Sequence, residues 1–121
     1  MPYNTDYSMT AYNAQLQAKQ KRLQQLLAPF ASPQPEVFAS APQHFRLRAE
    51  FRIWFESGVG HYAMFNPGDK HHPILLEQLP IASQRINELM PQLKAAWQAE
   101  PELSHRLFQA EFLTTLSGEA L

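Results

Sequence analysis

The sequence predicts an α+β fold: an antiparallel sheet of three or four strands, with an N-terminal helix and a second helix packed on one face. Residues 45–56 alternate between apolar and other side chains, which is the period of a strand. Residues 8–28 and 81–98 repeat their apolar side chains at helical spacing. With 121 residues, we expect a single domain over residues 1–121.

The first predicted helix, residues 8–28, is amphipathic. It ends at a stretch with three prolines, residues 29–35, where the missing backbone donors favour an extended connector. We expect Phe30 and Phe38 to pin this connector to the core. Because the connector lacks glycine and long polar tracts, it is not expected to separate independent domains.

The strands follow. A strand over residues 45–56 places its odd-numbered, apolar residues on one face. Ser57 and Gly58 suit a tight turn, and residues 59–65 then return as the second strand of a hairpin. A short third strand is expected at residues 73–76.

The second helix is predicted over residues 81–98, with Pro80 suited to its first turn and a bend just before Pro91. Residues 101–105 form a helical turn at most. Residues 107–116 are rich in Phe, Thr and Leu, which predicts another strand.

The C-terminus opens a hairpin. Ser117 and Gly118 suit a turn, but only residues 119–121 follow them, which are too few to pair with the preceding strand. We therefore expect the chain to be a truncated part of a longer protein that continues beyond Leu121.

Composition excludes several classes of protein. Hydrophobic residues make up 45% and charged residues 17%, which suits a packed core and argues against disorder. No apolar run approaches the ~18 residues of a membrane span, and residues 1–4 lack a signal-peptide pattern, so we predict a cytoplasmic protein. The absence of cysteine excludes disulfides, iron–sulfur clusters and thiolate nucleophiles within the chain.

The best candidate for binding is the even-numbered face of residues 45–56. Arg46, Arg48 and Arg52 share this face with Trp54. Arginine binds phosphate with two hydrogen bonds and an aromatic ring stacks on an unpaired base, so together they suit single-stranded or looped RNA. The alternative is a solvated face on which Glu50 takes part in a ladder of ion pairs between strands.

Other polar groups carry weaker signals. His71 and His72 are adjacent and lack further ligands at a metal-binding spacing, so we predict a surface loop and no metal site. A carboxylate pair for acid–base chemistry could come from Glu50, Glu56 and Glu111, but no nucleophile accompanies them. The glycines lack the spacing of a phosphate-binding loop. We therefore assign no catalytic, cofactor or metal site to the chain. Phe108 and Phe112 share one face of the last strand and are most simply core, although an exposed Phe108 could stack on a base.

Several segments carry a resemblance to a known family. The strand HFRLRAEFRIW, residues 44–54, and the preceding PEVF, residues 35–38, are its most specific parts. The other matching segments are Gln15-Leu16, Lys19, Arg22-Leu23, Ala28-Pro29-Phe30, Leu107-Phe108-Gln109 and Leu113-Thr114-Thr115-Leu116-Ser117. In this order they resemble the N-terminal, RNA-binding part of bacterial tRNA (uracil-5-)-methyltransferases. A related family that modifies ribosomal RNA carries a cysteine cluster, which this chain lacks.

The resemblance implies a function for the full-length protein. That family makes ribothymidine in the T-loop of tRNA, and a C-terminal Rossmann-like domain binds S-adenosylmethionine. By resemblance, a cysteine attacks the uridine, the methyl group moves to carbon 5, and a glutamate removes the proton. These groups would lie beyond Leu121, so the chain alone is expected to be inert and to bind no cofactor. Its partners would be the tRNA T-arm and the missing methyltransferase domain.

The resemblance also suggests contact residues. Arg52 and Phe108 stand where the family has T-loop contacts. Arg48 shares the strand face with Arg52, and Arg46 and Trp54 complete the candidate set. The alternative function is a non-catalytic module that binds a protein through the same face, with its arginines ion-paired.

Overall fold

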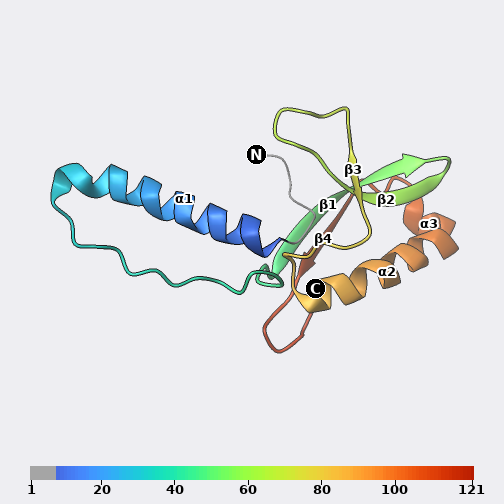
Figure 1. Ribbon diagram of the computed structural model, residues 1–121. Coiled ribbons are helices and arrows are strands. Elements are labelled where there is room, and N and C mark those ends of the chain that lie inside the picture. The colour runs from blue at the N-terminus through green and yellow to red at the C-terminus, as the bar shows by residue number, and fades with distance from the viewer. Residues whose placement is uncertain (1–7) are drawn as a thin grey trace. The chain divides into compact units, whose positions relative to one another are not determined.

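The computed structural model describes residues 8–121, which form two compact units, Ser8–Pro42 and Gln43–Leu121. The residues compared with a signal peptide, 1–4, lie outside the described part. The predicted fold class is confirmed, with an N-terminal helix, a four-stranded antiparallel sheet and a second helix (Figure 1). No helix within residues 8–121 is long and apolar enough to cross a membrane. The organisation as a single domain stays a prediction.

The first unit contains helix α1, Met9–Leu27, which follows the prediction closely. The Ser8 hydroxyl caps the helix by accepting a hydrogen bond from the Ala11 N–H at 3.2 Å. In the first turn of α1, the Tyr12 hydroxyl donates to the carbonyl of Ser40, near the end of this unit's sequence, at 2.6 Å. The long connector therefore returns to the beginning of the helix that it follows.

The predicted anchoring of the connector is wrong. After the short helix η1, Ala28–Phe30, the chain is extended, but Phe30 and Phe38 are 76% and 87% exposed. No residue of α1 is buried either. One helix and an extended segment supply no second layer, so this unit has no core of its own that could enclose the two rings.

The second unit is built on the sheet, whose strand order is β3-β2-β1-β4. The strands are β1 (Arg48–Glu56), β2 (Val59–Met64), β3 (Ile74–Leu76) and β4 (Gln109–Leu113). Strands β1 and β2 are joined by the predicted turn, in which Ser57 and Gly58 have φ of 51° and 80°. Two successive residues at positive φ are typical of a tight hairpin turn whose twist suits the strands.

The second helix, α2, spans Gln84–Ala99 and runs through Pro91. The Ser83 hydroxyl caps it by accepting from the Ile86 N–H at 3.2 Å. A single helical turn follows as α3, Pro101–Ser104, as expected. Helix α2 begins three residues later than predicted, which leaves Pro80 outside it.

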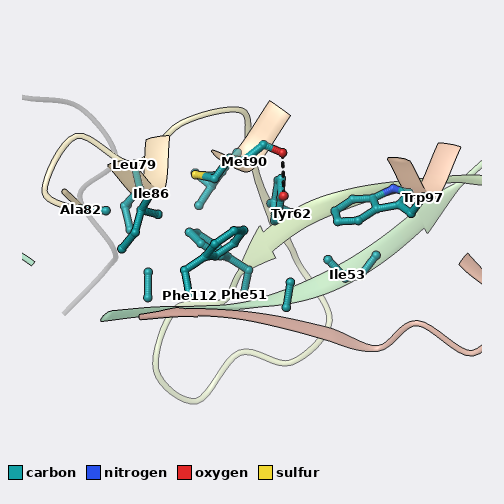
Figure 2. Packing of buried hydrophobic residues seen from close by; sticks show 12 residues of the cluster. Phe51, Ile53, Tyr62, Leu79, Ala82, Ile86, Met90, Trp97 and Phe112 are labelled. Carbon is teal, nitrogen blue, oxygen red and sulfur yellow. Dashed lines mark hydrogen bonds between the residues drawn. The ribbon is translucent and has the colours of Figure 1, made fainter. Parts of the chain in front are cut away.

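The core lies between α2 and one face of the sheet. Figure 2 shows Phe51, Phe112 and Tyr62 rising from the strands toward Ile86 and Met90 of the helix. Phe51, Ile86 and Met90 are fully buried, and Phe51 packs edge-on against Tyr62 at 5.2 Å between ring centroids. Each such side chain contributes roughly 1.5–3 kcal/mol relative to an exposed one.

The first strand is shorter than predicted, since it begins at Arg48 and not at Phe45. The backbone of Arg46 instead pairs in parallel with Ala82, in the segment that leads into α2. The Arg46 N–H donates to the Ile81 carbonyl at 2.9 Å, and its carbonyl accepts from the Ser83 N–H at 2.7 Å. Because of this pairing, Phe45 lies outside the sheet and is 41% exposed. The pairing also keeps Ala82 outside α2, so the helix begins later than predicted.

The C-terminal hairpin closes, contrary to the prediction that its last residues are too few to pair. Leu113 and Leu121 exchange two backbone hydrogen bonds of 2.9 Å. The hydroxyls of Thr115 and Ser117 both donate to the carboxylate of Glu119, which holds the pKa of that carboxyl below its usual value. Side chains within the turn therefore make pairing possible for so short a second strand.

Candidate nucleic-acid interface

The sheet face that carries the predicted binding residues is called the outer face here, because it lies opposite the face that packs against α2. Strands β1 and β4 pair in antiparallel register, with Arg48 opposite Leu113, Glu50 opposite Glu111 and Arg52 opposite Gln109. On β1 and β4, the outer face carries Arg48, Glu50, Arg52, Trp54, Glu56, Gln109, Glu111 and Leu113. All are exposed apart from Trp54, which is half-buried.

Arg52 lies in the middle of this face. Its Cα pairs with Gln109 of β4 on one side and Ala63 of β2 on the other, so its backbone is held by two neighbouring strands. The side chain is exposed and forms no ion pair with any residue of 8–121. A rigid backbone and an unpaired guanidinium together suit a contact with phosphate.

Arg48 has a different environment on the same face. Its Nε donates to Glu111 Oε1 at 2.6 Å, and its Nη2 lies 3.9 Å from Glu50 Oε2. The hydrogen bond and charge of Glu111 raise the pKa of the Arg48 guanidinium above its already high value. Among the described residues, the predicted ladder of ion pairs therefore includes Arg48 but not Arg52.

Trp54 continues the outer face toward the hairpin turn. Its ring meets Phe65 edge-on, with centroids 5.9 Å apart and planes inclined by 67°. This contact orients the indole while leaving part of it exposed. A fixed and partly exposed ring is suited to stacking on a base.

Arg46 departs from the predicted row. Because its backbone pairs with Ala82 and not with a strand of the sheet, Arg46 is not part of the outer face. Its side chain is exposed, and the neighbouring His44 ring contacts the Ala82 carbonyl through Nδ1 at 2.9 Å. Arg46 therefore stands on a separate segment that precedes β1 and is held by its pairing with Ala82.

Phe108 is 72% exposed, whereas Phe112 is 5% exposed, so the prediction of two core rings is right only for Phe112. Phe108 precedes β4, and its carbonyl accepts a hydrogen bond from the Ile53 N–H at 2.9 Å. It thus lies opposite Ile53, one position past the Arg52–Gln109 pair. By this register Phe108 lies on the side of the sheet opposite to the outer face, where its ring is open although its partner Ile53 is only 8% exposed.

Sequence reasoning missed the role of Glu111, which it considered only as a possible acid or base. The residue that binds Arg48 most closely is Glu111 on another strand, not its near neighbour Glu50. The alternation along β4 would have placed Glu111 on the outer face, but only the register shows that it reaches Arg48.

The histidines and glycines lie elsewhere. Asp69 accepts hydrogen bonds from the backbone N–H groups of His71 and His72, which lowers the pKa of its carboxyl. Within residues 8–121, no three His, Asp or Glu side chains gather as a metal site would require. Gly58 and Gly68 stand in separate turns at positive φ, so they do not fit a glycine-rich loop that would hold S-adenosylmethionine.

Comparisons with known proteins match most of the chain. Residues 11–121 match the family described as tRNA (Uracil-5-)-methyltransferase. Over 115 residues the chain is 65% identical to the tRNA/tmRNA (uracil-C(5))-methyltransferases of Pseudomonas putida (strain W619) and Ectopseudomonas mendocina (strain ymp), and 64% identical to that of Pseudomonas fluorescens (strain SBW25). Each alignment covers 95% of this chain and 32% of the relative. The chain thus spans about a third of the length of these curated relatives.

Proposed function

Since the chain belongs to the tRNA (uracil-5-)-methyltransferase family, we propose that it holds the T-arm of tRNA while the rest of the full-length protein methylates a T-loop uridine. The relatives' names, which specify tRNA or tmRNA and carbon 5 of uracil, support this substrate and reaction. The methyl donor in the full-length protein would be S-adenosylmethionine, and the reaction would take place in the cytoplasm. The 121-residue chain itself would bind RNA without catalysing the transfer.

The reaction explains why an RNA-holding surface is needed. An enzyme reaches a base in a structured loop by drawing it out of its stack, which costs a few kcal/mol. Contacts to the opened loop offset this cost, and in RNA such contacts are phosphate hydrogen bonds and aromatic stacking. The chain's own residues would therefore bind and orient the loop, leaving the bond-making steps to residues outside it.

The observation that carries the proposal is an exposed guanidinium and an exposed aromatic ring at neighbouring register positions of the sheet. Arg52 is exposed without an ion-pair partner in residues 8–121, and Phe108, one register position away on the adjoining chain segment, is 72% exposed. The two residues lie on opposite faces of the sheet beside its edge strand β4, so an RNA loop that wraps around this edge would contact both. Arg48, Trp54 and Arg46 would add further contacts around this centre.

Binding of a T-arm hairpin RNA to the 121-residue chain tests the proposal. Arg52→Gln should weaken binding severalfold and reduce the slope of log K against log salt by about 0.7, because one phosphate contact is lost. Phe108→Ala should cost about 1–3 kcal/mol of binding free energy if the ring stacks on a base. Arg85→Gln is a matched control, since Arg85 pairs with Glu88 on α2, away from the outer face. The proposal fails if Arg52→Gln and Phe108→Ala bind as the unchanged chain does.

The alternative of a protein-binding module is favoured by one observation, the ion pair between Arg48 and Glu111. A face whose arginine is already neutralised suits a partner with fewer negative charges than RNA. A salt titration separates the two functions, because binding through phosphates weakens steeply as salt rises. A flat salt response would favour the protein-binding function.

A further inference from the structure

Two carboxylates meet directly across strands on the outer face. Glu50 of β1 and Glu111 of β4 are register partners, and like charges placed opposite each other destabilise a sheet. Arg48 lies beside both, at 2.6 Å from Glu111 and 3.9 Å from Glu50. The three side chains together carry a net charge of −1, in the middle of a surface that would bind a polyanion.

This arrangement changes what Arg48 can do. Before its Nε binds a phosphate, Arg48 must give up the hydrogen bond to Glu111, and the freed carboxylate then repels the same phosphate. The side chains of Arg48 and Glu111 are 62% and 43% exposed, so water screens the pair. Breaking the pair therefore costs little free energy, and a phosphate can replace the carboxylate. Arg52 can bind a phosphate without first breaking an ion pair, because no carboxylate within residues 8–121 is paired with it.

We propose that Glu111 is a specificity-determining residue of the RNA-binding face. Its carboxylate occupies Arg48, and it weakens the binding of any RNA that cannot replace this carboxylate with a phosphate. The inference rests on the proposed function. A flexible strand gains little by displacing Glu111, because ordering its backbone at Arg48 costs entropy. A folded arm already held at Arg52 and Phe108 presents its next phosphates in a fixed position and can displace the carboxylate. Discrimination thus arises from a repulsive group as well as an attractive one.

The substitution Glu111→Gln tests this inference in the full 121-residue chain. Glutamine has nearly the same shape, and the site is exposed, so the fold should be retained. The two probes are a T-arm hairpin RNA and an unstructured oligouridine of equal length. Glu111→Gln should raise affinity for oligouridine about two- to fivefold, because a screened ion pair no longer competes. The salt slope for this RNA should steepen by about 0.7, and affinity for the T-arm should change less.

Two further variants isolate the contact. Glu56→Gln makes the same change of charge on the same face, and Glu56 forms no ion pair within residues 8–121, so it should leave both affinities nearly unchanged. The double variant Arg48→Gln with Glu111→Gln should bind oligouridine no more tightly than Arg48→Gln alone. Without Arg48, removing the Glu111 carboxylate frees no arginine for the RNA.

The outcomes separate the two proposals. If Glu111→Gln and Glu56→Gln raised the affinity for oligouridine equally, the effect would come from net charge alone, and the proposed role of Glu111 would be overturned. Weaker binding of both RNAs by Glu111→Gln would also overturn it, since Glu111 would then orient Arg48 for binding. In either case, T-arm binding that depends on Arg52 would leave the proposed function standing. Absence of salt-dependent binding to either RNA by the unchanged chain would instead refute the proposed function.

Discussion

The Tyr62 hydroxyl donates a hydrogen bond of 2.7 Å to the carbonyl of Met90, the residue that precedes Pro91 in α2 (Figure 2). Tyr62 is 1% exposed, and its ring meets Phe51 and Trp97 edge-on at 5.2 and 4.9 Å between centroids. The bond therefore satisfies the one polar atom that this core side chain brings inside. It also ties the middle of β2 to the helix that covers the sheet.

Tyr62→Phe should lower the free energy of unfolding by about 1 kcal/mol, since it removes one buried hydrogen bond while keeping the ring. Urea denaturation followed by circular dichroism measures this difference. Tyr12→Phe is the control, because the Tyr12 hydroxyl bonds to Ser40 in the exposed first unit. Equal stability of Tyr62→Phe and the unchanged chain would show that the hydrogen bond contributes nothing.

The same residue should make the fold sensitive to alkali. Burial raises the pKa of the Tyr62 phenol, whereas in the unfolded chain a phenol ionises near its ordinary pKa of about 10. Above that pH the unfolded state binds fewer protons than the folded state, so stability is present below about pH 10 and falls as pH rises, by at most about 1.4 kcal/mol per pH unit. Denaturation at pH 9 to 12 should show a smaller loss for Tyr62→Phe. Parallel curves for the two proteins would contradict this prediction.

Gly60→Ala should destabilise the sheet by about 1–3 kcal/mol, because there is no room for the added carbon. A Cβ at this position would lie 3.0 Å from Ile53 Cγ2 and 3.2 Å from Trp97 Nε1. The same indole nitrogen donates to the Gly60 carbonyl at 3.2 Å, so the Trp97 ring cannot move away without weakening this hydrogen bond. Thermal unfolding followed by tryptophan fluorescence measures the effect. Gly68→Asn is the control and should cost less than Gly60→Ala, since its surroundings are open and asparagine tolerates the positive φ of this position better than most residues.

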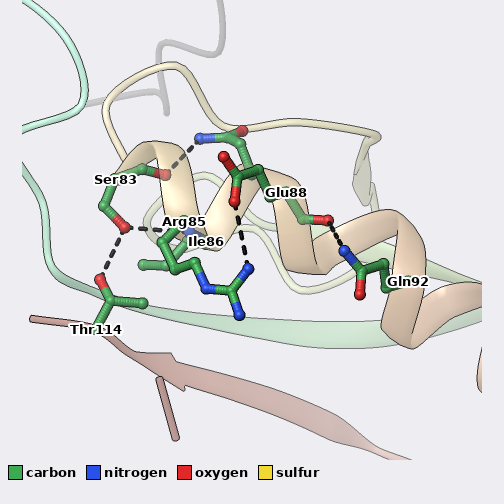
Figure 3. Close-up of polar contacts among 7 residues, drawn as sticks. Ser83, Arg85, Ile86, Glu88, Gln92 and Thr114 are labelled. Atoms are coloured by element: carbon green, nitrogen blue, oxygen red, sulfur yellow. Dashed lines mark hydrogen bonds and ion pairs between the residues drawn. The ribbon is translucent and has the colours of Figure 1, made fainter. Parts of the chain in front are cut away.

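Ser83 and Thr114 should be energetically coupled. Figure 3 shows the Ser83 hydroxyl between Thr114, at 2.8 Å, and the Ile86 N–H at the start of α2. Ser83→Ala removes the cap and leaves a buried hydroxyl without this partner, which should cost about 1–2 kcal/mol. Because Ser83→Ala and Thr114→Val remove the same bond, the double variant should lose less stability than the sum of the two single losses. Strict additivity in denaturation experiments would show that the pair is not coupled.

Much of the fold follows from local patterns. Alternation along residues 45–56 correctly assigned Phe51 and Ile53 to the core and Arg48 and Arg52 to the other face, because the direction of a strand side chain depends only on its own backbone. The ends of elements were less predictable. The start of β1 depends on the pairing of Arg46 with Ala82, which no pattern near Arg46 reveals.

The exposed Phe108 shows a similar limit. Its place in the alternation matches that of Ala110 and Phe112, both of which are buried. Whether a residue on the core side is actually covered depends on where the covering layer ends. That limit is set by the packing of the whole unit, so the sequence pattern assigned Phe108 to the core although it is open.

The amino-acid sequence by itself determined the strand, its two faces and the resemblance to the methyltransferases. Only the tertiary structure decided that, within residues 8–121, Arg48 has an ion-pair partner and Arg52 has none. The partner of Arg48 is Glu111, 63 residues further along the chain, and their contact requires one particular register of β4 against β1. A period of two residues is unchanged when a strand slides by two residues, so alternation alone cannot choose this register. The packing of Ala110 and Phe112 into the core chooses it.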